Sequence, residues 1–317
     1  MLVFVLNAGS SSLKYQLIDI KSKELKASGL VERIGIDGIL KHEIGENKKI
    51  TFELPIPTHK EAIELVLRIL TNDETKVINS IDEIKAIGHR VVHGGEHFKG
   101  SVIVDDEVIR KIEELIPLAP LHNPANILGV KICKDLMPKV PNVVTFDTAF
   151  HQTMPMENFL YAVPYADYTE HHLRKYGFHG TSHYYVSQEA IKLLNKKDSK
   201  VIVCHLGNGS SVCAVKDGKS ISTSMGLTPL EGLVMGTRSG DIDAGVIPYL
   251  MEKKGLNHIQ ILDYLNKKSG ILGVSGVSSD LREVIKAAND GDKRSKIAIT
   301  MLCDRIKKYL CSYAGLM

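Results

Sequence analysis

The stretch LVFVLNAGSSSLKYQLIDI, residues 2–20, decides the fold that we expect for this chain. It reads as an apolar strand, a turn of Asn, Gly and Ser, and a second strand, and the same design returns in VIVCHLGNGSSVCAVKDGKSI, residues 201–221. Small residues let a backbone approach an anion closely, and N–H groups with Ser hydroxyls can hold phosphate oxygens. One such turn can equally be an ordinary hairpin. Two of them indicate a duplicated domain whose halves clasp a polyphosphate.

Length and composition leave room for two domains and exclude some classes of partner. The chain has 317 residues and a net charge of +3, without a dense Lys/Arg block, so we expect no nucleic-acid partner. No apolar run reaches about eighteen residues, so we expect no membrane span. The N-terminus enters a strand without the basic start of a signal peptide. We therefore expect a cytoplasmic protein, whose five cysteines are reduced and are mostly core residues.

The first half predicts three strands, a helix, a strand, two helices and a last strand. The strands are expected at 2–6, 13–20, 25–34, 84–92 and 142–146, with a further one near 50–54. Thr58 and Glu61 form a capping box before one helix, Asp105 can cap the next, and Pro124 suits the first turn of the third.

The second half begins in the same way and then turns helical. Strands are expected near 201–206, 211–216 and 219–224, and helices near 242–253, 257–267, 280–289 and 292–314. By analogy with the first half, further strands should follow, so the second domain looks cut short at Met317. The expected fold is α/β, with two duplicated domains at 1–150 and 151–317 and a mixed sheet in each.

Several polar side chains stand where these strands end. Lys14 could meet a phosphate or be a surface lysine, and Asn7 could orient a metal-bound water or only form the turn. Arg90 lies in a largely apolar strand, so its guanidinium needs an anionic partner, either a structural carboxylate or a substrate. Arg238 lies among small residues that allow close approach. One arginine could bind a carboxylate and the other could neutralise a phosphoryl group in transfer.

Three further residues carry open alternatives. Asp147 follows a strand, where it could be a base, a water positioner or a helix N-cap. His179 is expected in the loop before a helix that Ser182 caps, and it can donate to a developing negative charge. Asp280 can cap a helix whose first N–H groups would suit a nucleotide.

Taken together, the motifs resemble those of the acetate kinases, the acetokinase family of the actin-like (ribonuclease H-like) sugar-kinase superfold. The matching runs include Asn7–Lys14, Arg90–Gly95, Pro120–Pro124, Phe146–His151, Tyr176–His183, His205–Gly209, Thr228–Gly232 and Gly236–Asp243. They follow the family's order along the whole chain. The resemblance implies reversible transfer of a phosphoryl group between ATP and acetate, giving ADP and acetyl phosphate, with Mg²⁺ as cofactor and a homodimer as the assembly.

The resemblance also implies a role for each matching residue. Arg90 would bind the acetate carboxylate, and His179, Arg238 and Asp147 would be catalytic. The residues that resemble the pocket for the acetate methyl group are Val92, Leu121, Phe178 and Pro229. Those that would face ATP are Lys14, His205, Leu206, Gly207, Asn208, Gly209, Asp280, Leu281 and Arg282. Asn7 would be associated with Mg²⁺, while the family's second metal-associated residue, a glutamate, and its adenosine-binding turn belong to a segment that this chain lacks.

Other functions remain open at this stage. A propionate kinase differs by one methylene of substrate, and the volume of Val92 favours acetate. A nucleotide-binding fragment without turnover would fit the shortened second domain. A purely structural actin-like protein would form filaments and would not need a carboxylate site.

Overall fold

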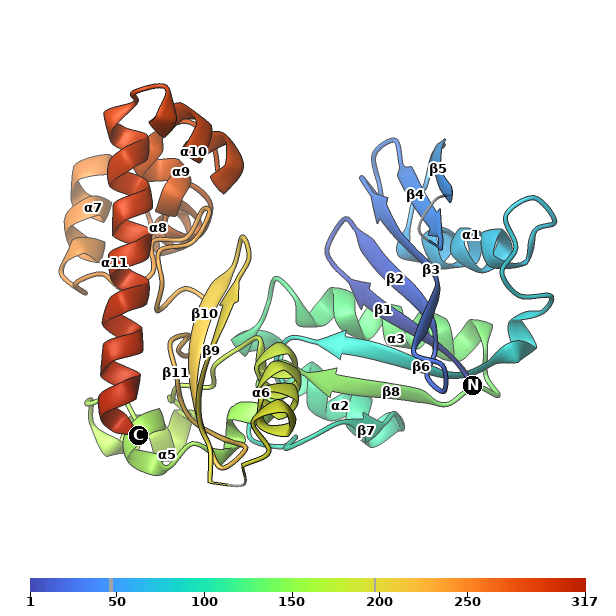
Figure 1. Cartoon of the computed structure of the whole chain (residues 1–317), viewed down its shortest axis with the longest axis horizontal. Coiled ribbons are helices and arrows are strands. Elements are labelled where there is room, and N and C mark those ends of the chain that lie inside the picture. The colour runs from blue at the N-terminus through green and yellow to red at the C-terminus, as the bar shows by residue number, and fades with distance from the viewer. Residues whose placement is uncertain (46–47, 197) are drawn as a thin grey trace. The chain divides into compact units, whose positions relative to one another are not determined.

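The computed structural model describes residues 1–45, 48–196 and 198–317, and the chain divides into two compact units, Met1–Ala149 and Phe150–Met317 (Figure 1). Among the described residues, no helix has the length and apolar character needed to cross a membrane.

Unit 1 is built on an eight-stranded mixed sheet. In chain order its strands are β1 Leu2–Ala8, β2 Leu13–Asp19, β3 Glu24–Glu32, β4 Ile39–Ile44, β5 Lys48–Glu53, β6 Ile84–Val91, β7 Val102–Ile103 and β8 Asn142–Phe146. They lie side by side in the order β5-β4-β3-β2-β1-β6-β8-β7. The hairpins from β1 to β5 are antiparallel, whereas β1, β6 and β8 run parallel to one another. The carboxyl ends of these three parallel strands therefore meet at one edge of the sheet.

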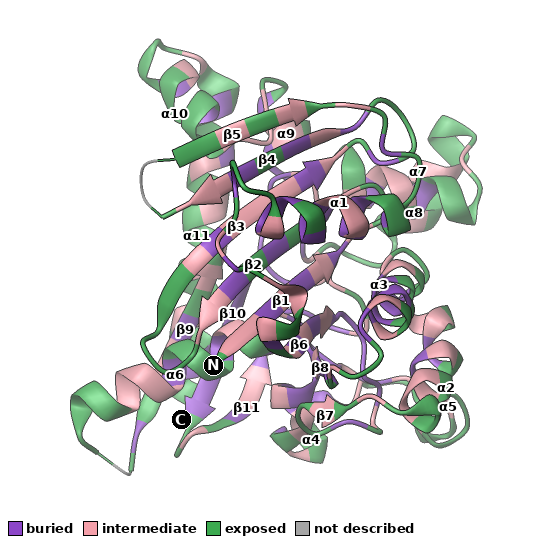
Figure 2. Cartoon of the chain, turned by 90° about the vertical axis from the view of Figure 1, so that its right-hand side faces the viewer, coloured by how far each residue is buried: buried purple, intermediate pink, exposed green. Residues whose placement is uncertain are grey.

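Helices cover one face of this sheet. The strands β1 and β2 alternate between buried and more exposed residues (Figure 2), and the buried set forms one hydrophobic core with α1 His59–Thr71 and α3 Asn123–Leu136. α3 approaches β1 closely at Gly129, where a Cβ would lie 3.1 Å from the Cβ of Ala8. α2 Asp106–Glu114, which Asp105 caps as predicted, belongs to a second core with the ends of β6 and β8.

On the buried face, the ring of Tyr15 lies over Gly29. The two residues are opposite each other on β2 and β3, and a Cβ on Gly29 would lie 2.4 Å from that ring. The Tyr15 hydroxyl reaches His42 Nδ1 on β4 at 2.5 Å, and burial raises the pKa of Tyr15 above its ordinary range. The glycine thus leaves room for an aromatic ring that ties three strands together.

Unit 2 contains a three-stranded sheet and most of the helices. β9 Lys200–Leu206, β10 Ser210–Lys216 and β11 Lys219–Thr223 are antiparallel throughout. The helices are α4 Met156–Phe159, α5 Tyr165–His171, α6 Gly180–Leu194, α7 Val246–Lys254, α8 His258–Lys267, α9 Gly270–Ser275, α10 Leu281–Asn289 and α11 Lys293–Leu316. Asp292 caps the long helix α11 by accepting from the Ser295 N–H at 2.7 Å. The buried Tyr313 near the end of α11 packs with β10 residues Val212 and Ala214.

Several predictions of sheets, short elements and cysteine burial made from the sequence are wrong. The sheet of unit 2 holds no parallel pair among the described residues, so the mixed sheet expected there is not found. The strands β4 and β7 and the helices α4, α5 and α9 were not predicted, because each is short or lacks a clear periodicity. Only two of the five cysteines are core residues, whereas Cys204, Cys303 and Cys311 are exposed.

Candidate functional site

Unit 1 gathers polar side chains at the carboxyl ends of its parallel strands. Asn7 lies near the end of β1, Arg90 near the end of β6, and Asp147 directly after β8. The Asp147 N–H donates to the Val91 carbonyl at 3.1 Å, which fixes the chain as it leaves the sheet. Ligands of open α/β sheets bind at such an edge.

Arg90 and Asp147 form a two-pronged ion pair. Arg90 Nε donates to Asp147 Oδ1 at 2.9 Å, and Nη2 donates to Oδ2 at 2.6 Å. Burial opposes the charge on Arg90, but the hydrogen bonds and charge of Asp147 outweigh it and raise the pKa of Arg90. The Asp147 side chain is 3% exposed, whereas that of Arg90 is 40% exposed. The sequence marked both residues, but it left the anionic partner of Arg90 open, and the structure supplies a carboxylate of the chain itself.

Two asparagines of α3 connect the backbone at the ends of these strands, and neither was predicted as a site residue. Asn126 accepts from the Val92 N–H at 3.0 Å and donates to the Ala8 carbonyl at 2.7 Å, so one amide joins the ends of β1 and β6. Asn123 pairs with both backbone groups of His93, each at 3.1 Å. The only sequence signal was an Asn at two helix positions facing the sheet.

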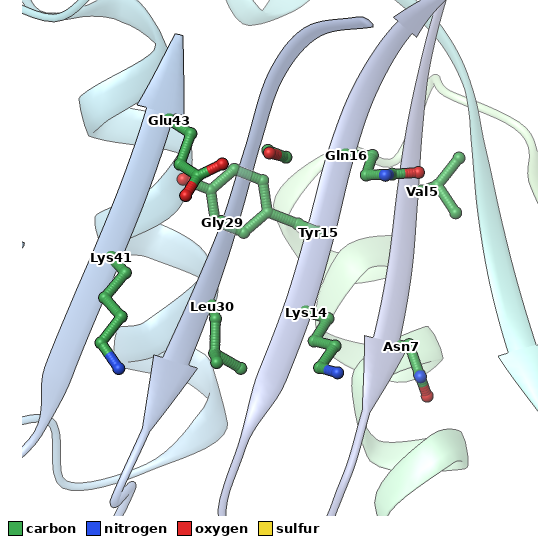
Figure 3. Close-up of a pocket in the computed structure, with 10 residues that line it drawn as sticks. Val5, Asn7, Lys14, Tyr15, Gln16, Gly29, Leu30, Lys41 and Glu43 are labelled. Carbon is green, nitrogen blue, oxygen red and sulfur yellow. The ribbon is translucent and has the colours of Figure 1, made fainter. Parts of the chain in front are cut away.

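Asn7 and Lys14 lie directly opposite each other across β1 and β2. They belong to the face of the sheet away from α1 and α3, where they help to line a hollow of about 430 Å³ (Figure 3). Two cross-strand rows form its floor, namely Asn7, Lys14, Leu30 and Lys41, and Val5, Gln16, Ser28 and Glu43. The two side chains that the sequence marked beside the first turn therefore lie on the same face of the sheet.

In unit 2, His179 and Arg238 converge on Gly209. A Cβ built on Gly209 would lie 3.4 Å from Arg238 Nη1 and 3.5 Å from His179 Nε2. Arg238 Nη1 also donates to the Pro229 carbonyl at 3.3 Å, and burial lowers the pKa of Arg238. An arginine nevertheless stays protonated in proteins, so the group is cationic.

The helix start near His179 differs from the prediction. Ser182 does not cap α6; the helix begins at Gly180, and His179 itself occupies the N-cap position in a left-handed conformation, with φ of 58°. Ser182 lies inside the helix and bonds to His205 Nδ1 at 2.9 Å. His205 in turn stacks on His179, with ring centroids 4.1 Å apart.

The predicted ATP-facing segments of unit 2 meet around one hollow of about 380 Å³. Leu206, Gly207 and Asn208 line it from the β9–β10 turn, and Asp280 and Leu281 line it from the start of α10. Gly236 N–H donates to the Asn208 carbonyl at 2.9 Å and holds the turn in place.

Three further ATP-facing predictions, His205, Gly209 and Arg282, are not among the residues that line this hollow. The Arg282 side chain is 90% exposed and pairs with Asp280, which caps α10. This pairing lowers the pKa of Asp280 to about 2. His205 is not among the residues lining the hollow and packs in a histidine cluster instead.

The four residues predicted for the methyl pocket differ in exposure. Val92 and Phe178 are buried, at 6% and 2% exposed, whereas Leu121 is 67% exposed. Pro229 is partly buried and its carbonyl contacts Arg238. Within the described residues, no three His, Cys, Asp or Glu side chains are grouped so as to hold a metal ion by themselves.

Comparison with known proteins agrees with this arrangement. The model of the acetokinase family matches residues 2–317. Acetate kinase of Treponema denticola is 56% identical over 318 residues, which cover 99% of this chain and 80% of that protein. The solved acetate kinase of Porphyromonas gingivalis is 49% identical, with a TM-score of 0.96 over 100% of this chain and 80% of that one. A solved propionate kinase of Francisella tularensis is 44% identical, with a TM-score of 0.94 and the same coverage.

These matches extend over nearly the whole chain and far exceed what a shared fold alone produces. The chain thus has the actin-like α/β fold of the solved acetate kinase. The chain belongs to the acetokinase family.

Proposed function

We propose that this chain transfers a phosphoryl group between ATP and acetate, giving ADP and acetyl phosphate. The observation that carries the proposal is the convergence of His179 Nε2 and Arg238 Nη1 on Gly209, within a turn that also lines the hollow at α10. Two donors aimed at one point, beside a turn suited to phosphate, are what charge development on a transferring phosphoryl group requires. Family membership supports the same reaction.

In this reaction an acetate oxygen attacks the γ-phosphorus while the bond from that phosphorus to the bridging oxygen of ADP breaks. The electron pair of that bond leaves with ADP, and no proton has to move. Catalysis therefore depends on positioning and on neutralising charge. We assign that neutralisation to Arg238 and His179.

Arg90 is proposed to bind the acetate carboxylate. A guanidinium has five N–H donors, and Asp147 uses two of them, so donors remain for a second carboxylate. Because the Arg90 side chain is 40% exposed, a small anion can reach it. Asp147 is then a positioning residue that holds the guanidinium plane, rather than a base.

Nucleotide and methyl binding are assigned by the same proposal. In unit 2, the turn His205–Gly209 and the segment Asp280–Arg282 would take the nucleotide. In unit 1, Lys14 would bind phosphate. Unit 1 is accordingly the acetate and phosphate lobe and unit 2 the nucleotide lobe. The acetate methyl group would lie against Val92, Leu121, Phe178 and Pro229.

Mg²⁺ fits these residues only as an ion that arrives with the nucleotide. Mg²⁺ prefers oxygen ligands and usually keeps several waters beside substrate phosphates. The Asn7 amide oxygen beside Lys14 offers one such ligand, whereas Asp147 is held by Arg90. When bound, the ion would neutralise charge on the β- and γ-phosphates, and Asn7 would orient it or its water.

Substrate choice is the first prediction. We expect kcat/KM for acetate to exceed that for propionate about tenfold to a hundredfold, because one misplaced methylene costs roughly 1–3 kcal/mol and Val92 is already buried. Trapping the acyl phosphate with hydroxylamine measures both acids in one assay, with ATP hydrolysis in the absence of acid as the control. A preference for propionate would assign the chain to the alternative activity.

Two further properties are proposed from family membership alone. These are a homodimeric state, which light scattering would test, and a cytoplasmic location, which cell fractionation would test. Filaments detected by light scattering or in a cell fraction would instead favour the structural actin-like alternative.

A further inference from the structure

Unit 2 contains a cluster of four histidines, His151, His179, His183 and His205, of which the proposed function gives a role to His179 and His205. The ring centroids of His183 lie 5.7 Å from His151, 6.4 Å from His179 and 6.3 Å from His205. His183 is fully buried on α6. The remaining question is what this buried ring does beside His179.

A single hydroxyl links His183 to His179. The Oγ of Ser211, a fully buried residue on β10, lies 2.9 Å from His179 Nδ1 and 2.7 Å from His183 Nε2. A hydroxyl carries one proton and two lone pairs. Among the described residues the Ser211 hydroxyl contacts no acceptor other than these two nitrogens, so a satisfied hydroxyl donates to one of them and accepts from the other. The protonation sites of the two rings are therefore coupled.

Two arrangements satisfy this bridge when both rings are neutral. In the first, His183 Nε2–H donates to Ser211, whose hydroxyl donates to His179 Nδ1, so the His179 proton resides on Nε2. In the second, every proton is reversed: His179 Nδ1–H donates to Ser211, and the remaining His183 proton resides on Nδ1.

The other nitrogen of His183 favours the first arrangement. His183 Nδ1 is buried and has no hydrogen-bond partner among the described residues. In the first arrangement this atom is a bare lone pair, whereas in the second it is an N–H without an acceptor. Orphaned N–H groups are the rarer of the two in folded proteins.

The surroundings also keep His183 neutral. Burial, followed by the charges of His151, His179 and His205, holds the pKa of His183 well below its ordinary value. These three histidines are the titratable groups that face it from the segment after unit 1, from α6 and from β9. A neutral His183 has a single proton to place, as the bridge requires.

We propose that Ser211 and His183 act together as a positioning pair that fixes His179 as the Nε2–H tautomer. His179 Nε2 is the atom that faces Gly209 and Arg238. The pair thus presents a donor, rather than a lone pair, to the point where negative charge develops. This inference rests on the proposed function for its catalytic meaning, but the tautomer itself is a property of the resting protein.

The test combines histidine tautomers with kinetics. Long-range ¹H–¹⁵N spectra of the ¹⁵N-histidine-labelled chain report the tautomer of each ring, and His179→Gln and His183→Gln variants assign the signals. In the wild type we expect both His179 and His183 as Nε2–H forms. In Ser211→Ala we expect His179 to become a mixture of tautomers and kcat to fall about tenfold to a hundredfold, the range of a residue that orients a functional histidine, with KM for acetate little changed.

Matched variants separate positioning from folding. Ser187→Ala removes another fully buried hydroxyl of unit 2, which donates to the Tyr184 carbonyl at 2.9 Å, and should leave the His179 signals unchanged. Ser211→Thr keeps the hydroxyl and should restore the Nε2–H form even if its methyl group lowers the melting temperature.

The two failures are distinguishable. A wild-type spectrum with His179 as the Nδ1–H form would overturn the inference, whatever the tautomer of His183 and whatever the turnover. An Nε2–H form that persists unmixed in Ser211→Ala would do the same. If the expected tautomers are observed but no acetyl phosphate forms, the proposed function is refuted and the positioning pair of Ser211 and His183 is supported.

Discussion

Replacing Arg238 by Ala is expected to lower kcat/KM for acetate about 10³-fold, the usual effect of removing a donor or arginine from a developing phosphoryl or oxyanion charge. Arg238 Nη1 would lie 3.4 Å from a Cβ built on Gly209. Because Arg238 is partly buried, little water competes with the phosphoryl group for its charge. The loss should appear mainly in kcat, because the interaction strengthens in the transition state. Initial-rate assays of acyl phosphate formation measure it.

Gly209→Ala is a matched change that leaves both cationic and imidazole groups in place. The added methyl would lie 3.4–3.6 Å from Arg238 Nη1 and the His179 ring, which is ordinary contact, so the fold should persist. It would nevertheless occupy the point on which the two donors converge, and we expect kcat to fall at least tenfold. Gly100→Ala, where a Cβ meets nothing within 4 Å, is the control. Full activity of Gly209→Ala would show that the phosphoryl group does not pass this point.

Arg90→Ala is expected to have two effects that can be measured separately. Loss of the acetate-binding guanidinium should lower kcat/KM for acetate about a hundredfold or more, largely through KM, as for a lost charged pair of 3–5 kcal/mol. The same change leaves the 3%-exposed Asp147 carboxylate without its partner. We expect the free energy of unfolding to fall by about 1–3 kcal/mol because a buried carboxylate loses its partner. The loss should be no larger, since water can enter the half-exposed position of Arg90.

A second substitution distinguishes these effects. In Arg90→Ala/Asp147→Asn the buried charge is removed as well, so chemical denaturation should show most of the stability restored while acetate turnover stays low. Arg90→Lys keeps a charge but not the fork that spans both carboxylate oxygens, so it should recover stability more than KM. An unchanged KM for acetate in all three variants would mean that Arg90 has only a structural role.

How much of this site could be read from the sequence depended on whether the signal was local. Asn7 and Lys14 flank a short turn, so antiparallel pairing alone brings them face to face. Asp147 directly follows a buried strand, and the carboxyl end of such a strand faces the ligand site of an α/β sheet, so its place at the sheet edge was expected. By contrast, no local pattern shows that Asp147 is the partner of Arg90, because the two residues meet only through parallel pairing of β6 and β8.

Elements that depend on tertiary contacts were the ones missed. Asn126 looks like an ordinary helix residue until its amide is seen between Ala8 and Val92. Ser182 fits the preference for serine at a helix N-cap, yet the N-cap lies three residues earlier, at His179, which adopts a left-handed conformation and bonds to Ser211. Packing around a functional group outweighed the local preference there.

We propose that the 317-residue chain carries a phosphoryl group from ATP to a short carboxylic acid. A ³¹P spectrum recorded over time, with the chain, MgATP and acetate together, observes that transfer without a coupled assay. The account predicts that the signals of ADP and acetyl phosphate grow in equal amounts as the γ-phosphate signal of ATP declines. A spectrum in which no acetyl phosphate signal forms, or in which inorganic phosphate grows without acetyl phosphate, would contradict the proposed transfer.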